Sequence, residues 1–132
     1  MNKLNINLVL CHEADKSTGS LKGIHNHFKK EEKGVTFSLV MFISALDKIE
    51  RDLHLVLISG DGKQKLLRKV RVEQDEKQAS NDMHINTFNE VGLEEGLYEF
   101  RVLSTSLTEE AIKIQDLAQE GTLEGLLKFK IV

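Results

Sequence analysis

Alternation of apolar and polar residues dominates this chain and predicts β-strands along most of its length. Residues 4–10 place leucine and isoleucine at every second position, with Asn5 and Asn7 between the first three of them. Near the other end, Leu127, Phe129 and Ile131 alternate with lysines in the same way. Successive side chains of a strand point to opposite faces, so each of these runs has one face suited to a core.

Two glycine-rich turns give the strongest signals. Residues 52–59 and 64–73 flank the sequence Gly60-Asp61-Gly62-Lys63, and glycine accepts the positive φ that hairpin turns need. Residues 94–96 form a second turn that leads into a strand over 97–103, with Tyr98 facing inward. Together, the two signals favour an antiparallel sandwich.

Weaker patterns complete the series of strands. Residues 35–43 are apolar on both faces from Leu39 onward, which predicts a central strand covered on both sides. The remaining segments are predicted as a weak strand over 21–28, a connector over 45–51, a surface loop over 74–82 and a poorly patterned strand over 83–91.

One segment has the period of a helix instead. Ser106 and Glu109 fit a capping box, and apolar residues then recur at spacings of three and four up to Ala118. Gly121 is a typical helix stop, so we expect a helix over about 108–120. Its apolar stripe is expected to cover the core, with docking of a partner as the alternative.

The fold class that follows is mainly β. We expect residues 1–132 to form one domain, an antiparallel β-sandwich of seven or eight strands with the helix before the last strand. The chain of 132 residues is long enough to bury a core of this kind.

Composition narrows the setting. The single cysteine, Cys11, cannot form an intramolecular disulfide, which favours a reducing compartment. The alternating N-terminal residues do not resemble a signal peptide, and no apolar run has the length of a membrane span. We therefore expect a cytoplasmic protein without membrane contact. The formal net charge of −3 argues mildly against nonspecific nucleic-acid binding.

Basic residues recur at odd positions in the strand over 63–71. On a regular strand they would form one basic stripe, suited to an acidic partner, a phosphate-bearing ligand or a nucleic acid. Lysines on exposed strands also protect against aggregation, which is the structural alternative. The stripe consists of Lys63, Lys65, Lys69 and Arg71.

Two histidines are the only weak metal candidates that the pattern offers. His25 and His27 are two residues apart, so on one strand both rings would point to the same side. A metal site needs a third or fourth ligand, and the spacing does not identify one. We expect both to be surface histidines.

No catalytic or cofactor motif is present in the sequence. We therefore expect no enzyme activity and no cofactor. The function favoured is a noncatalytic binding or assembly module that acts through protein contacts at a loop end or a sheet edge, with self-association as one form. The alternative is binding of a polyanion or nucleic acid through the basic face over 63–71.

Several segments also resemble a family of small uncharacterised bacterial proteins. The resemblance rests on Leu8-Val9-Leu10-Cys11, on residues 19–28, on residues 55–62 and on Gly96-Leu97-Tyr98. His12 departs from the acidic residue common in that family. The resemblance implies an immunoglobulin-like or C2-like sandwich of bacterial or phage origin. It implies no established activity, and no functional residue is transferred from it.

Overall fold

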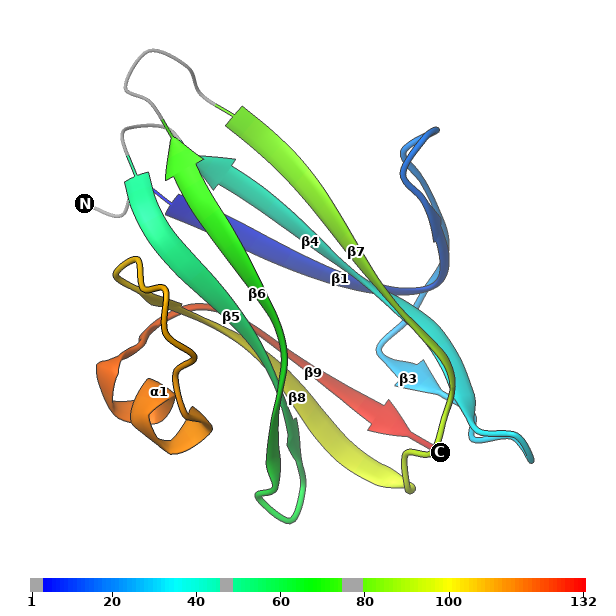
Figure 1. Cartoon of the computed structure of the whole chain (residues 1–132). Helices are drawn as coiled ribbons and strands as arrows, with labels where there is room; N and C mark the ends of the chain where they lie inside the picture. The colour runs from blue at the N-terminus through cyan, green and yellow to red at the C-terminus, as the bar shows by residue number, and fades with distance from the viewer. Residues whose placement is uncertain (1–3, 46–48, 75–79) are drawn as a thin grey trace.

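Two β-sheets facing each other make up most of the molecule (Figure 1). The computed structural model describes residues 4–45, 49–74 and 80–132. The elements are β1 Leu4–Asp15, β2 Ser20–Ile24, β3 His27–Phe28, β4 Val35–Ala45, β5 Ile49–Ser59, β6 Gln64–Gln74, β7 Ser80–Val91, β8 Gly96–Thr105, α1 Ile114–Glu120 and β9 Thr122–Ile131. The fold is therefore mainly β with one short helix before the last strand, as the alternating pattern predicts.

The strand order places the most apolar strand in the middle of its sheet. One sheet has the order β2-β1-β4-β7, and the other has the order β3-β9-β8-β5-β6. All of the pairings are antiparallel except the short one between β3 and β9. The prediction that residues 35–43 form a central strand is confirmed for its position, because β4 pairs with β1 on one side and β7 on the other. The expected cover on both faces is not found in the described residues: the inner face packs in the core, and no helix lies over the outer face (Figure 1).

A single apolar cluster joins the inner faces of the two sheets. At its centre, Phe37 of β4 is fully buried and stacks between the rings of Phe28 and Phe88, with centroid distances of 4.9 and 4.8 Å. Phe100 and Phe129 of the opposite sheet stack on each other at 4.9 Å and tilt against the Phe37 ring. Five of the six phenylalanines thus form one contact group.

The strand count and one strand differ from the sequence prediction. The described residues form nine strands, where seven or eight were expected. The prediction of one strand over 21–28 is wrong, because the chain leaves the first sheet after Ile24 and enters the second sheet at His27. The crossing has a physical reason: Phe28 is fully buried in the core, whereas Ile24 stays mostly exposed at the rim of the first sheet.

Two further boundaries also move. Residues 49–51, expected in a connector, already belong to β5, and β7 begins at Ser80 inside the expected loop. The rest of that loop, residues 75–79, lies outside the described residues, as do residues 46–48.

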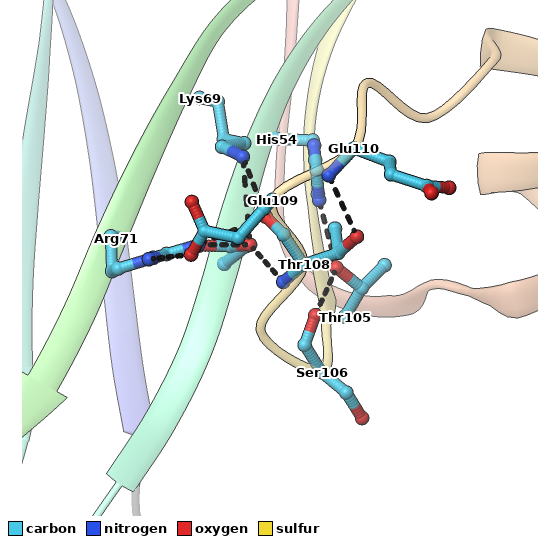
Figure 2. Close-up of polar contacts among 9 residues, drawn as sticks. His54, Lys69, Arg71, Thr105, Ser106, Thr108, Glu109 and Glu110 are labelled. Carbon is cyan, nitrogen blue, oxygen red and sulfur yellow. Dashed lines mark hydrogen bonds and ion pairs between the residues drawn. The ribbon is translucent and has the colours of Figure 1, made fainter.

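The helix is shorter than the sequence predicts. The α1 helix begins at Ile114 and ends at Glu120, and the expected first half over 108–113 is not helical. We call residues 106–113 the strap. It crosses the outer side of the five-stranded sheet, where the backbone of Thr108 is bound by side chains of β5 and β6 (Figure 2). These contacts hold the segment away from helical geometry.

Candidate functional site

The four basic residues of the expected stripe do not share one face of β6. Two consecutive residues of β5 pair with residues on either side of Leu67, so Leu67 is the extra residue of a β-bulge. The bulge reverses the alternation of side chains. Lys65 pairs with Leu57, whose side chain belongs to the core, whereas Lys69 and Arg71 pair with residues of the outer face. The geometry of a single stripe is therefore wrong, and a binding role for its members stays a prediction.

On the outer face, Lys69 and Arg71 surround a buried carboxylate (Figure 2). Asp52 is fully buried and accepts hydrogen bonds from Arg71 Nε at 3.0 Å and from the Thr108 backbone N–H at 3.0 Å. The Thr108 carbonyl accepts bonds from Lys69 Nζ at 3.1 Å and from Arg71 Nη2 at 2.9 Å. Arg71 Nη1 also binds Glu109 at 2.8 Å. We call these five residues the Asp52 cluster.

The contacts of the Asp52 cluster decide its charge states. Burial by itself would raise the pKa of Asp52, but the Arg71 and Thr108 hydrogen bonds and the charges of Lys69 and Arg71 outweigh it and lower the pKa. The hydrogen bond from Arg71 likewise lowers the pKa of Glu109. Both carboxylates are thus charged at neutral pH and partner the two cations. The cluster therefore fastens the strap to the sheet, and neither cation is left as an open binding group.

This cluster predicts a loss of stability in acid. The pKa of Asp52 is lower in the folded chain than in the unfolded chain, so the stabilisation is complete above the unfolded value of about 3.9 and is lost as the pH falls through the folded value. We expect the free energy of unfolding, measured by urea titration, to fall below about pH 4. Asp52→Asn should be less stable at neutral pH and lose less on acidification. An equal acid slope in both proteins would contradict this role.

A buried histidine lies beside the cluster. His54 is fully buried, and its Nε2 is 2.9 Å from the Thr105 hydroxyl, which itself donates to the Ser106 carbonyl at 3.1 Å. Burial is the main reason why the pKa of His54 is lowered, and the charge of Lys69 adds to it. A neutral His54 therefore supports the first residues of the strap.

The other two basic residues border a cleft at the opposite end of β5 and β6. This turn-end cleft lies between residues 59–65 and residues 92–98, has a volume of about 730 Å³ and is lined largely by apolar surface. Leu57, Leu93, Leu97 and Tyr98 supply the apolar lining, and Lys63 and Lys65 lie with them. The two glycine-rich turns singled out in the sequence thus meet at one cleft.

Backbone geometry explains how the two turns approach each other. Ser59 pairs with Tyr98 across β5 and β8, and a Cβ atom at Gly60 would lie 3.2 Å from the Leu97 carbonyl oxygen. Gly62 and Gly96 have φ values of 87° and 144°, a region that other residues rarely adopt. Glycine is therefore needed to close both turns beside the cleft.

Polar contacts hold the rim of the cleft. The Tyr98 hydroxyl donates to the Glu94 carbonyl at 2.7 Å, and Lys30 binds the Glu94 carboxylate at 3.1 Å from far away in the sequence. Asp61 accepts bonds from the Ser59 hydroxyl and from the Lys63 backbone N–H, and these bonds lower its pKa. Burial raises the pKa of Tyr98, so its hydroxyl stays a donor at neutral pH.

The cleft leaves one large apolar side chain in solvent. Leu97 is 66% exposed, while the neighbouring Tyr98 ring stacks on Phe129 at 5.4 Å and fixes the floor. Sequence reasoning identified Tyr98 as inward-facing but missed Leu93 and Leu97 as lining residues. The signal was the pair Leu93 and Leu97 on either side of the Glu94-Glu95-Gly96 turn, because leucines next to turn residues need a partner or stay exposed.

The two histidine candidates do not act as a pair on one strand. His25 lies in the crossing between the sheets and His27 begins β3, with ring centroids 5.6 Å apart. A third ring, His12 of β1, lies 5.1 Å from His25 and packs edge-on against Phe28. In residues 4–45, 49–74 and 80–132, no group of three or more His, Cys, Asp or Glu side chains is placed to hold a metal ion.

Comparisons with known proteins add little to this geometry. No family model matches the sequence, and no curated protein matches it. Among solved structures, the chain is similar to the X-ray structure of Northeast Structural Genomics Consortium target SoR45. The two have 9% sequence identity and a TM-score of 0.44, over 98% of this chain and 88% of that chain. The resemblance to a family of bacterial sandwich proteins stays a prediction. Within the described residues, none of the helical structure has the length and apolarity needed to cross a membrane.

Proposed function

We propose that the chain is a noncatalytic binding module that holds an apolar segment of a protein partner in the turn-end cleft. The observation that carries the proposal is the cleft itself, which is lined by the exposed Leu97 together with Leu57, Leu93 and Tyr98. Apolar sites with a few polar groups at the rim are the usual form of recognition sites. The bacterial, cytoplasmic setting and the immunoglobulin-like or C2-like relationship remain part of the proposal.

Charge at the rim suits a protein segment better than a polyanion. The rim carries Lys63 and Lys65 together with Asp61, Glu94 and Glu95, so both signs of charge are present. Lys63 is already 3.7 Å from the Asp61 carboxylate. A polyanion would meet carboxylates at every approach, whereas a peptide can present an apolar side chain to the floor and mixed polar groups to the rim.

The alternative, binding of a polyanion, is less favoured because its four cations do not share one face of β6. It required four cations on one strand face, but the bulge at Leu67 separates Lys63 and Lys65 from Lys69 and Arg71. The latter two also neutralise Asp52 and Glu109. For this reason, we favour the peptide cleft.

Peptide selection tests the proposal even though the partner is unidentified. We expect a random peptide library displayed on phage to yield apolar sequences that bind the purified chain. Leu97→Asp should weaken the binding of a synthetic selected peptide at least about tenfold, because it places a charge in the apolar lining of the cleft. Fluorescence anisotropy with a labelled peptide measures the change.

A matched control uses another exposed leucine. Leu123 is 51% exposed on the outer face of the five-stranded sheet, far along β9 from the cleft, and Leu123→Asp should leave peptide affinity unchanged. Equal losses in both variants would refute the cleft as the site. Salt-dependent binding of a single-stranded oligonucleotide, with no selected peptide retained, would favour the polyanion alternative instead.

A further inference from the structure

The outer face of the four-stranded sheet carries no charged side chain over most of its described extent. Cross-strand pairing places its residues in rows that run over β2, β1, β4 and β7. The rows are Ile24–Cys11–Ser38–Thr87, Val9–Val40–Ile85, Asn7–Phe42–Met83 and Asn5–Ser44. We call these residues the uncharged face. Charge returns only one row further, at Glu13 and Lys22.

The composition of this face is unusual for a surface in contact with water. Charged residues make up 30% of the chain, so a face of this size is expected to hold several. Antiparallel sheets with one solvated face normally alternate apolar and polar residues, but here the outer positions of the central strand include Val40 and Phe42. Val40 itself is fully buried. Depletion of charge with enrichment of Met and aromatic residues is typical of interface centres.

The outer face of the five-stranded sheet provides a comparison within the same chain. The outer face of the five-stranded sheet carries charged residues such as Glu99 and Arg101, which pair with each other at 3.0 Å. The α1 helix packs on β6 and β8 there (Figure 1). In the described part of the chain, no helix lies over the uncharged face (Figure 1).

The edge of the uncharged face is also unprotected. β7 is the last strand of its sheet, and from Met83 to Asn89 it contains no lysine, arginine or proline. The neighbouring edge strand β6 carries Lys65, Arg68, Lys69 and Arg71 instead. Basic residues on edge strands discourage association, so the two edges differ in the way expected if one of them borders an interface.

We propose that the uncharged face is a self-association surface on which a second copy of this chain packs face to face about a two-fold axis. In such a dimer, the same patch lies on both sides, and any charge near the axis would face its own copy. A face without charge avoids that repulsion, and it offers nothing to select a charged partner. The absence of charged side chains from the face is therefore our reason for proposing a second copy of the chain as its partner.

The area of the face agrees with a weak dimer. Three strands about 4.8 Å apart, with about eight residues each at about 3.4 Å, give roughly 400 Å² per copy, to which β2 adds only Ile24. Two copies then bury roughly 800 Å², which is below the size of a stable interface and agrees with weak, transient association. We therefore expect a dissociation constant in the micromolar range, so the dimer forms on concentration and dissociates on dilution.

Sedimentation equilibrium tests the proposal on the full chain. We expect the weight-average mass to rise from 15.0 kDa towards twice that value between about 1 μM and about 1 mM. Met83→Lys and Ile24→Lys should each raise the dissociation constant at least about tenfold. Ile24 is 62% exposed, so its substitution leaves the fold intact and keeps the test valid if Met83→Lys unfolds the chain.

Leu123→Lys on the other sheet is the matched control and should dimerise like the unmodified chain. A mass of 15.0 kDa at every concentration overturns the proposal. Dimerisation that is lost in Leu123→Lys and retained in Ile24→Lys overturns it as well. Neither result bears on the turn-end cleft, because the peptide assay uses residues outside the uncharged face.

Cross-linking separates face packing from pairing of two β7 edges. Phe42 lies on the central strand β4, so edge pairing would keep two Phe42 positions three strand spacings apart, about 14 Å. In face packing, the two positions lie opposite each other. We expect Phe42→Cys to be joined into a covalent dimer by a bismaleimide shorter than that separation, with the buried Cys11 of the unmodified chain unreactive. A dimer that resists this reagent overturns the face-to-face arrangement.

Discussion

Phe37→Ala is expected to lower the free energy of unfolding by about 4 kcal/mol, the largest loss expected from any single side chain of the core. Phe37 is fully buried, and its ring contacts Phe28 of β3, Phe88 of β7 and both central rings of the opposite sheet. Removing it leaves a void that borders both sheets. The rigid backbone of three neighbouring strands prevents the surroundings from closing it. Urea denaturation followed by tyrosine fluorescence or circular dichroism measures the loss.

Phe42→Ala is the matched control, since it removes the same ring from the same strand. Phe42 is only half-buried and points to the uncharged face, so the expected loss is less than half as large. The comparison is made at low micromolar concentration, at which the proposed dimer is dissociated. Equal losses for the two variants would show that the aromatic cluster does not form the centre of the core.

The sequence predicted the sandwich because most strands have one buried face. In the last strand, Phe129 and Ile131 point inward and the lysines between them point outward, and the structure places them so. The same reasoning gives a wrong prediction where the local alternation and the packing of the core require different paths of the chain. Residues 21–28 read as one strand, but Phe28 reaches the core only if the chain changes sheets.

The basic stripe failed for a different reason. Side chains alternate along β6 as the sequence predicts up to Lys65, but one extra residue at Leu67 reverses every side chain beyond it. No residue type marks this bulge, since leucines occur on both sides of the strand pattern. Residues that alternate in the sequence share one face of a strand only if that strand has no bulge. The presence of a bulge depends on how the strand pairs with its neighbour.

Only part of the turn-end cleft could be predicted from the sequence. Both of its turns were visible as glycine-rich segments, but their meeting depends on the pairing of Ser59 with Tyr98 across β5 and β8. That pairing joins segments about forty residues apart, and alternation alone does not choose among partner strands. The uncharged face likewise becomes apparent only when β1, β4 and β7 are placed side by side.

Asp52→Ala is expected to cost about 3 kcal/mol, because breaking one side of a buried ion pair leaves its partners with uncompensated charge. Arg71 is about one-third exposed and recovers some hydration, which keeps the loss at the lower end for such pairs. The Thr108 N–H loses its acceptor at the same time. Thermal or urea unfolding of the variant at neutral pH gives the value.

Glu109→Ala provides the control, because Glu109 binds the same guanidinium but is 89% exposed. An exposed ion pair contributes little, so we expect a much smaller loss than in Asp52→Ala. The difference in stability between the two variants therefore measures the effect of burying the carboxylate. Losses of equal size would mean that Asp52 acts only as another surface carboxylate.

The strap gives Asp52→Ala a second readout that stability alone does not supply. Residues 106–113 have a capping box and helical spacing, yet contacts from Asp52, Lys69 and Arg71 hold the Thr108 backbone in a non-helical path. In Asp52→Ala, fewer contacts oppose the helical preference of residues 106–113. We expect the NMR Cα shifts of residues 108–113 to move in the helical direction in Asp52→Ala but not in Glu109→Ala. Unchanged shifts in both would mean that other contacts determine the course of the strap.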